Sequence, residues 1–378
     1  MRILTKDFDS LYEISAFFNL PTELIIDSNK EFFDQGSVLP DEINIPGFSL
    51  LPSCFQEEEN QGAIRSVERT FQENKQKLWK HTSPAIVGRM EYSPEILERD
   101  LAVLKQAYPY ASVREIGKSV LGNPIKEIKI GKGNRKIHIN ASFHANEWIT
   151  SGVLMELVNA YLIALTNNGG LHGAEAMGAY RSVELSIVPM VNPDGVSLVI
   201  NGPPKGLEKN LLKMNNGSTD FSGWKANCNG VDLNNQFPAN WEIEKGRKEP
   251  KSPAARDYPG NKPLSEPEVA AMAKLVRESQ FDMVIAFHTQ GEEFYWGYGG
   301  REPGDSEKLA AIFSKSSGYK AVRSIDSHAG FKDWFIQEFG KPGFTIELGK
   351  GINPIPLSQY NKIYNQIKGI FISALNWR

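Results

Sequence analysis

From residue 84 onward, short apolar segments rich in β-branched residues alternate with longer amphipathic segments, and this alternation constrains the fold more than any other feature. The strand-like segments are residues 125–131, 136–143, 182–191, 282–289 and 343–349. Such alternation predicts an α/β fold with a mixed, mostly parallel twisted sheet and helices on both faces. Ligands of these sheets bind at the carboxyl ends of the strands, so polar residues there are the first candidates for a site.

Size and charge limit the classes of partner. The chain has 378 residues, of which 40% are hydrophobic, so it can hold one large domain and a small module. Its 42 Lys and Arg against 45 Asp and Glu give a net charge of −3, and without a basic field we expect no nucleic-acid partner. No apolar stretch approaches the roughly 20 residues that span a bilayer, so no membrane partner is expected either.

Residues 1–47 are expected to form a separate small unit with the order β-α-α-β. Ser10 is placed to cap the first helix and Pro21 to begin the second. The unit resembles the LysM module, which binds glycans that contain N-acetylglucosamine, such as peptidoglycan; a small packing subdomain is the alternative. A charged connector is expected over residues 48–83, followed by a catalytic domain over residues 84–378.

The N-terminal segment and the cysteines bear on location. Residues 1–18 have no apolar core followed by a small-residue cleavage site, so the expected address is cytoplasmic. Cys54 and Cys228 are the only cysteines, which predicts neither a disulfide framework nor a cysteine-rich metal site.

Two of the six histidines end apolar strands. His144 follows residues 136–143, and His288 closes the apolar run that begins at Met283. Glu147 comes three residues after His144, in the expected first turn of a helix. A lone histidine is more often structural, but two histidines and one carboxylate form a catalytic zinc set with one position left for water.

Glu347 is the candidate general base. It lies in the apolar strand 343–349, where a charge is costly to bury without a reason. Zinc lowers the pKa of water and polarises a carbonyl, and a nearby carboxylate can move the proton to the leaving amine. The alternative for Glu347 is a buried carboxylate paired with a lysine.

Three other motifs have structural explanations. The sequence Asn192-Pro193-Asp194-Gly195 is typical of a tight turn, although its asparagine could line the site. Asp232 could support a ligand or cap a strand end. Tyr295 and Trp296 could line a cleft, but core packing is the simpler expectation.

Six short motifs in order carry a family resemblance: "FHANEW", "VNPDG", "GVDLNNQFP", "SEPEV", "AFHT" and "FTIEL". From about residue 85 to the end, the chain resembles the zinc metallocarboxypeptidase superfamily (peptidase family M14). The resemblance implies a carboxypeptidase-like fold and one zinc ion held by His144, Glu147 and His288. It also implies that Glu347 is the general base.

The departures from that family concern the substrate. Where carboxypeptidases have an Asn-Arg pair that clamps the terminal carboxylate, this chain has Asn234 and Asn235, which cannot make a guanidinium clamp. Lys225 stands where they have an arginine that polarises the scissile carbonyl, and a lysine can still supply a point charge there. His328 occupies the loop in which they carry a tyrosine.

The segments "GVDLNNQFPANW" and "WKAN" resemble one branch, the γ-D-glutamyl-L-diamino acid endopeptidases of spore-forming bacteria. These cleave between γ-D-glutamate and diaminopimelate in peptidoglycan stem peptides and often carry LysM modules. The resemblance implies a zinc metallopeptidase that degrades cell-wall peptides, possible use in sporulation, and glycan binding through residues 1–47. Asn234, Asn235, His328 and Arg301 are the candidate substrate-binding residues, with surface solvation the alternative for Arg301.

Two other functions stay open. One is a conventional carboxypeptidase that removes C-terminal residues, which Asn235 disfavours. The other is a catalytically silent peptidoglycan-binding protein, which the intact zinc set and Glu347 disfavour. A cytoplasmic enzyme of this kind would reach the wall or the spore by an undetermined route.

Overall fold

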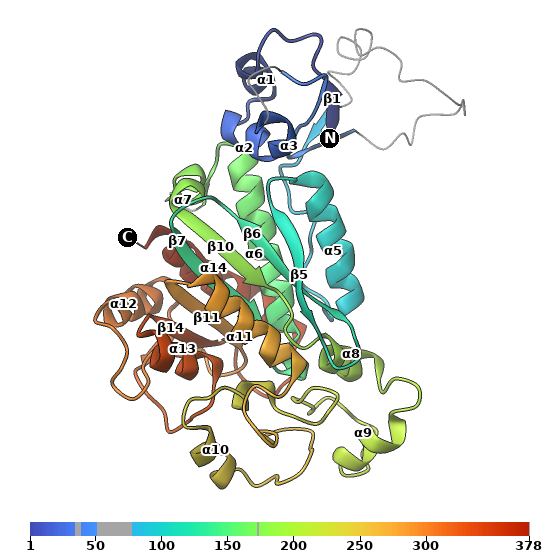
Figure 1. Ribbon diagram of the computed structural model, residues 1–378, viewed down its shortest axis with the longest axis vertical. Helices are drawn as coiled ribbons and strands as arrows, with labels where there is room; N and C mark the ends of the chain where they lie inside the picture. The colour runs from blue at the N-terminus through green and yellow to red at the C-terminus, as the bar shows by residue number, and fades with distance from the viewer. Residues whose placement is uncertain (35–38, 51–77, 172–173, 378) are drawn as a thin grey trace. The chain divides into compact units, whose positions relative to one another are not determined.

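The computed structural model describes residues 1–34, 39–50, 78–171 and 174–377, and it contains two compact units (Figure 1). The first unit comprises Met1–Ala85, Asp100–Ser112 and Val158–Gly178. The second comprises Ile86–Arg99, Val113–Leu157 and Ala179–Arg378. The first unit thus includes two segments from beyond residue 84. Most of the expected charged connector, and Cys54 with it, lies outside the described residues.

The sheet of the second unit has eight strands in the order β13-β12-β14-β11-β7-β10-β6-β5. Their bounds, in that order, are Lys320–Val322, Glu293–Tyr295, Gly343–Glu347, Met283–His288, Arg135–Ala141, Val183–Val188, Pro124–Ile130 and Ser112–Lys118. The sequence analysis missed the short strands β12 and β13 and the strand β5.

The pairing of the central strands brings four carboxyl ends to one edge. Strand β7 pairs in parallel with β10 and β11, and β11 pairs in parallel with β14, whereas β6 and β12 run antiparallel to their neighbours β10 and β14. His288 lies opposite Glu347, and Phe287 lies opposite Ala141. The expected mixed, mostly parallel sheet is confirmed.

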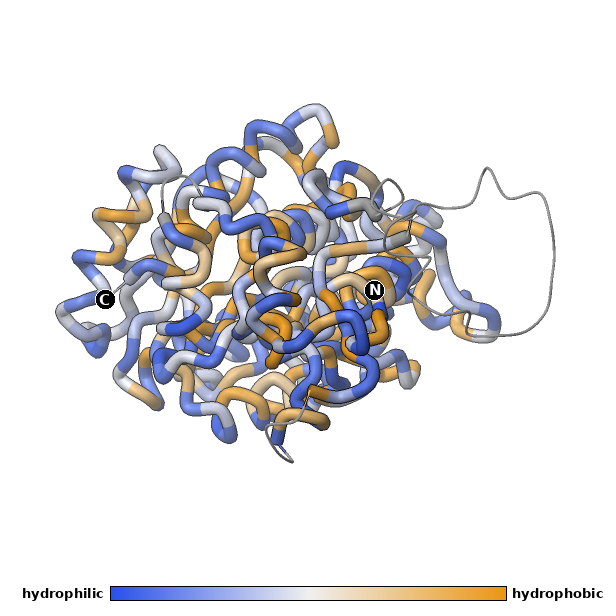
Figure 2. The backbone as a smooth tube through the Cα atoms, turned by 90° about the horizontal axis from the view of Figure 1, so that it is seen from above, coloured by the Kyte–Doolittle hydropathy of each residue, from blue (hydrophilic) through white to orange (hydrophobic). Residues whose placement is uncertain are grey.

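Helices cover both faces of the sheet (Figure 1). The bounds are α5 Pro94–Ala107, α6 Ile149–Thr166, α7 Ala176–Ser182, α8 Pro193–Asn201, α9 Glu208–Met214, α10 Trp241–Arg247, α11 Pro267–Ser279, α12 Asp305–Ser317, α13 Phe331–Phe339 and α14 Tyr360–Asn376. Apolar residues of α11 and α13 form one core cluster with Val284 and Ala286 of β11. Successive side chains of a strand point to opposite faces of the sheet, so Ile285 and Phe287 point to the face opposite α11 and α13. Figure 2 shows apolar and polar stretches alternating at short intervals, as amphipathic elements require.

Helix α6 is unusually apolar. The stretch Ala145–Thr166 is long and apolar enough to cross a membrane, but 78% of its most apolar window is buried inside the protein. A core helix has this composition because every side meets other protein atoms.

The N-terminal part of the first unit has the expected strands and two helices, and it adds a third helix of four residues before the second strand. Its bounds are β1 Arg2–Leu4, α1 Leu11–Phe18, α2 Thr22–Asp27, α3 Lys30–Phe33, β2 Glu42–Asn44, β3 Phe48–Leu50 and β4 Leu78–Lys80. Strands β1 and β2 pair antiparallel, and Ser10 caps α1 by accepting a 3.2 Å hydrogen bond from the amide of Glu13. Eight buried residues form the core of this part: Ile3, Ile14, Phe18, Leu20, Ile25, Ile43, Ile45 and Phe48.

Candidate active site

A short turn after β7 places the first two polar residues of the site. His144 precedes the 3-10 turn η1 (Ala145–Glu147), so Glu147 lies in this turn and not in the first turn of α6 as expected. The turn is held from outside, because the Ala145 amide donates to the Lys225 carbonyl at 3.0 Å. The Asn192 amide group also donates to the carbonyl of Phe143 at 3.2 Å and to that of Ala226 at 3.1 Å.

His144, Glu147 and His288 converge on one point. His144 Nδ1 lies 2.9 Å from Glu147 Oε1, and His288 Nδ1 lies 3.0 Å from Glu147 Oε2. The two Nδ1 atoms are 3.2 Å apart, and all three side chains are buried. They are the one group in the described part of the chain that could hold a metal ion through at least three such side chains, with ligand atoms within 4.8 Å of one another.

The chemistry of these atoms fits a zinc ion. His144 Nε2 lies 3.2 Å from Asp232 Oδ1, and this contact favours the tautomer whose Nδ1 carries a lone pair. Two ligands at about 2.05 Å from one tetrahedral zinc ion are roughly 3.3 Å apart, close to the separation of the two Nδ1 atoms. Two such lone pairs repel each other unless a cation lies between them. The residues present therefore fit the metal.

Glu147 is held more firmly than any other side chain here. Its Oε2 accepts from the Thr289 amide at 3.2 Å, and its Oε1 accepts from the Asn353 side-chain amide at 3.3 Å. Lys225 Nζ lies 3.4 Å from Oε1. Burial alone would raise the pKa of Glu147, but its contacts with His144 and the positive charge of Lys225 outweigh burial and hold that pKa well below its usual range.

Glu347 ends β14 beside His288. Burial raises the pKa of Glu347 to about 8, and the negative charge of Glu147 adds to the effect. A carboxylate with a pKa near the working pH can both accept and return a proton. Lys225 carries the positive charge nearby, because Glu147 and Asp232 raise its pKa against the opposing effect of burial.

These residues line one pocket of about 450 Å³. Six of the nine candidates from the sequence lie in it: His144, Glu147, Lys225, Asn234, His288 and Glu347. Asn235, His328 and Arg301 do not. Asn235 is buried in the turn η2 (Leu233–Asn235), His328 Nδ1 lies 2.9 Å from the Tyr298 hydroxyl, and Arg301 is exposed. Their role in substrate binding stays a prediction that the pocket lining does not support.

The pocket also contains residues that the sequence analysis did not select as site residues, among them Arg256, Tyr295 and Asn353. Tyr295 is on β12, which pairs with β14, so the expectation that it packs in the core was wrong. Asn353 follows Glu347 by six positions, and a search of the loops after each strand end could have found it. Arg256 lies in an irregular loop where no local pattern pointed to it.

Two of the motifs singled out in the sequence support the site without lining the pocket. Asp232 has the expected supporting role, because it contacts His144, and it caps the 3-10 turn η2 in place of the expected strand end by accepting from the Asn234 amide at 3.1 Å. Asn192 caps α8 by accepting from the Gly195 amide at 3.0 Å. Asp194 accepts from Ser119 at 2.6 Å, away from the pocket lining.

Comparison with known proteins places the chain among relatives. A family model described as zinc carboxypeptidase matches residues 97–366. The chain is 43% identical to gamma-D-glutamyl-L-diamino acid endopeptidase 1 of Lysinibacillus sphaericus over 99% of this chain and 100% of that protein. It is also 43% identical to the uncharacterized protein YqgT of Bacillus subtilis (strain 168), over 94% of this chain and 95% of that protein.

A solved structure agrees on the fold. Carboxypeptidase A from Helicoverpa armigera matches 82% of this chain and 81% of its own with a TM-score of 0.57 at 17% identity. The family match, the full-length relative and the zinc-compatible cluster identify the protein as a metallopeptidase whose cofactor is zinc. The chain belongs to the zinc carboxypeptidase family.

Proposed function

We propose that this protein hydrolyses the bond between γ-D-glutamate and diaminopimelate in peptidoglycan stem peptides. The observation that carries the proposal is the pocket lining, which joins the three metal-binding side chains to Glu347 and Lys225. Its substrate class is supported by the relative at 43% identity over the whole chain, whose name states a γ-D-glutamyl-L-diamino acid endopeptidase.

The proposed roles follow from the positions of the side chains. When bound by His144, Glu147 and His288, zinc supplies a lowered pKa for water and polarises a carbonyl. Glu347 accepts the proton of the attacking water on its carboxylate and delivers it to the leaving amine. Lys225 places its ammonium group where the carbonyl oxygen gains negative charge.

A comparison of substrates tests the proposal. A γ-D-glutamyl-diaminopimelate tripeptide and a hippuryl amino acid are each incubated with the zinc-loaded protein, and the released amine is measured. Cleavage of the tripeptide at the γ-glutamyl bond is expected. Turnover of the hippuryl substrate alone would contradict the proposal and favour the conventional carboxypeptidase, while a protein that binds no zinc would favour the silent binder.

One observation favours the conventional carboxypeptidase as a second candidate. Arg256 lines the pocket and could bind a terminal carboxylate in place of the arginine that residues 234 and 235 lack. Both candidates use the same zinc set, so the substrate comparison separates them.

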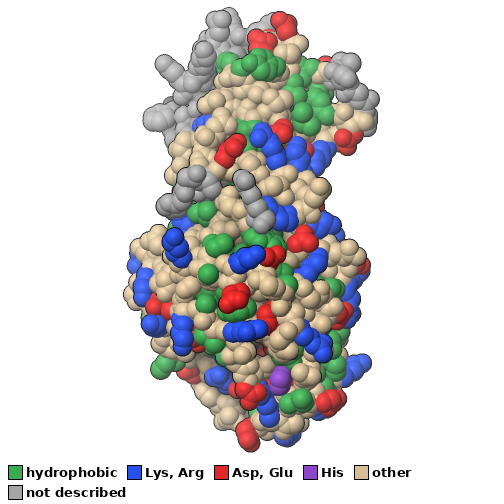
Figure 3. Space-filling view, turned by 90° about the vertical axis from the view of Figure 1, so that its left-hand side faces the viewer, with side chains coloured by type: hydrophobic (Ala, Val, Ile, Leu, Met, Phe, Trp, Pro, Cys, Tyr) green, Lys and Arg blue, Asp and Glu red, His purple; other side chains and the backbone are tan. Residues whose placement is uncertain are grey.

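We also propose that the N-terminal part binds peptidoglycan glycan in the manner of a LysM module, and that the substrate is wall material of a sporulating cell. The order β1-α1-α2-α3-β2, which adds only the short helix α3 to the expected pattern, and the antiparallel pairing of β1 with β2 support the module. A wall-binding module raises the local concentration of substrate without any new contact at the site. On the face in Figure 3, basic and acidic side chains are interspersed.

The module is tested by a change in its core. Ile14 is fully buried, and Ile14→Ala is expected to destabilise this part by about 2–5 kcal/mol. Retention on insoluble sacculi should fall while hydrolysis of the soluble tripeptide is unchanged, and the exposed Glu31→Ala serves as the control. Equal retention of a variant whose module is shown to be unfolded would mean that this part does not bind glycan.

A further inference from the structure

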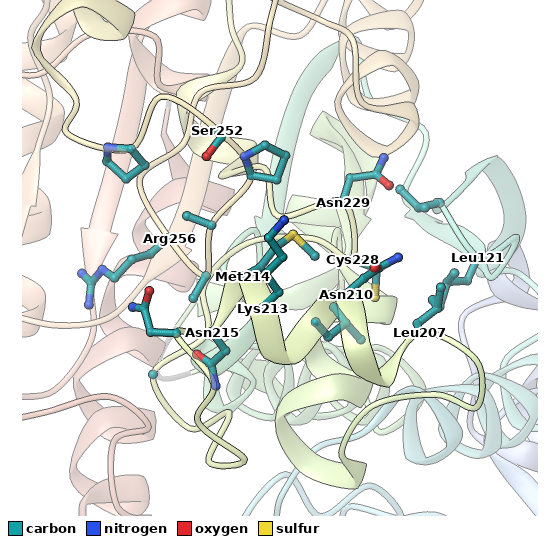
Figure 4. A pocket seen from close by; sticks show the side chains of 18 residues that line it. Leu121, Leu207, Asn210, Lys213, Met214, Asn215, Cys228, Asn229, Ser252 and Arg256 are labelled. Carbon is teal, nitrogen blue, oxygen red and sulfur yellow. The ribbon is translucent and has the colours of Figure 1, made fainter.

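A second cavity adjoins the metal pocket. Its volume is about 1000 Å³, and it shares Gly223 and Arg256 with the smaller pocket. Figure 4 shows Arg256 at one end of this cavity and Leu121 and Leu207 at the other. Leu207, Leu211 and Met214 also belong to an apolar cluster under it, so the cavity has an apolar floor beside a polar wall.

The charged groups of this cavity have one sign. Lys213 and Arg256 line it, and none of its 18 lining residues in the described part of the chain is Asp or Glu. Cys228 adds no charge, because burial raises the pKa of its thiol to about 12. In a chain of net charge −3, such a lining favours an anionic ligand.

Arg256 is the cation that both cavities share. Its Nε donates to Asp257 Oδ2 at 3.0 Å, and neither of its terminal nitrogens has a hydrogen-bond partner among the described residues. In Figure 4 its side chain points away from Met214 and Cys228. The positive charge of Arg256 also acts on Lys225, where it partly opposes the carboxylates that raise the pKa of that lysine. An arginine with two unused terminal nitrogens suits a carboxylate.

We propose that the two cavities form one substrate groove, and that Arg256 binds the free α-carboxylate of the γ-D-glutamyl residue. This rests on the proposed function. A γ-glutamyl bond uses the side-chain carboxyl group, so the α-carboxylate remains beside the scissile bond, where an ordinary peptide has none. The larger cavity then holds stem-peptide residues farther along one side of that bond.

Gly223 marks the passage between the cavities. It is exposed, and a Cβ atom added there would meet no heavy atom within 4 Å. A larger side chain at this position is therefore compatible with the fold and would project into the groove.

The first experiment varies both the α-carboxylate of the substrate and the side chain of Arg256. The substrates are a stem tripeptide with D-glutamate and one with D-isoglutamine, whose α-carboxamide removes the charge. Arg256→Ala is expected to lower kcat/KM on the carboxylate substrate by about 10- to 100-fold, mostly through KM, and to leave the carboxamide substrate within about 3-fold. Arg256→Lys should fall between. Arg277→Ala, an arginine that lines neither cavity, is the control.

The outcomes separate two failures. If the parent protein cleaves neither tripeptide, the proposed function itself fails. If the parent cleaves them but Arg256→Ala affects both substrates equally, or neither, the role of Arg256 is overturned while the proposed function stands.

The second experiment blocks the passage. The parent is expected to prefer a stem peptide lengthened at one end over the tripeptide, and Gly223→Leu should lower kcat/KM on the longer peptide about 10-fold more than on the tripeptide, so that the preference is lost. Gly246→Leu, which also meets open space but lies in α10, is the matched control. A parent with no preference for length, or a variant that keeps it, overturns the continuous groove.

Discussion

The two ends of the metal pocket are built in opposite ways. At one end, the Glu147 carboxylate is fully buried and receives hydrogen bonds from a backbone amide and from Asn353. At the other end, where the second cavity adjoins, Arg256 is exposed and makes one ion pair with Asp257. A reacting centre gains from groups that cannot move, because reorganisation would cost free energy in each turnover.

The exposed end follows a different requirement. A substrate that arrives in water must displace solvent from its partner, so a partly hydrated arginine can exchange water for a carboxylate at little structural cost. We therefore expect changes at the buried end to affect metal content and kcat. Changes at the exposed end should affect KM and the choice of substrate.

The largest effect is expected for His144→Ala. Its ring supplies one of three metal ligands, so the variant should lose zinc and with it measurable peptide hydrolysis. Metal analysis of the purified protein measures the zinc content. His328→Ala, a histidine outside the pocket lining, should keep a full complement of zinc. A His144→Ala protein with undiminished zinc would rule out the ligand assignment.

Glu347→Gln separates proton transfer from metal binding. The amide keeps the shape of the side chain but cannot accept a proton, so kcat should fall by about 10²-fold or more while zinc is retained. Steady-state kinetics and metal analysis on the same preparation measure both. Glu307→Gln, an exposed residue of α12 outside the pocket lining, is the control. Activity near that of the parent would remove Glu347 from the reaction.

Lys225→Met removes the positive charge and keeps most of the side-chain volume. We expect kcat to fall by about 10²-fold with a smaller change in KM, because the charge is needed most where the oxyanion develops. Lys248→Met, a lysine that pairs with Glu244 outside the pocket lining, should lower kcat less than 3-fold or so. A Lys225→Met variant that behaves like this control would restrict Lys225 to a structural pairing with Glu147.

Asp232→Asn tests the support behind His144. An asparagine can donate to Nε2 and so favour the tautomer with a proton on Nδ1, the atom that faces the cluster. Loss of such a partner typically costs about 10- to 100-fold in metal affinity. Chelator competition measures the zinc affinity, and the exposed Asp326→Asn is the control. Unchanged affinity would show that the tautomer does not depend on Asp232.

The contrast between the two ends also explains what could be read from the sequence. His144 and His288 stand at or next to strand ends, and the rule that parallel strands place their carboxyl ends together located them, whereas Glu347 was found as a charge in an apolar strand. The strands themselves are apolar because they are buried on both faces, which makes them visible as patterns. The short strands β12 and β13, at one side of the sheet, have three residues each, too few for a periodic signal.

Residues held by loops could not be found in this way. Arg256 and Asn353 reach the pocket through the path of irregular backbone, which no local periodicity describes. His328 and Arg301 were predicted to bind substrate because of the loops they occupy, but neither residue lines the pocket. The position of a loop side chain depends on contacts remote in sequence, such as the bond from the His328 amide to Glu244.

Arg301→Ala should have the smallest effect. Arg301 is exposed and lines neither cavity, so kcat/KM on the γ-D-glutamyl tripeptide is expected to stay within about 2-fold of the parent value. Comparing this variant with Arg256→Ala on the same substrate shows whether substrate binding requires the guanidinium group of Arg256 in particular. A loss as large as that of Arg256→Ala would mean that the loop of Arg301 closes over bound substrate. Substrate recognition would then depend on movement of the Arg301 loop as well as on the exposed Arg256, while the metal site stays fixed.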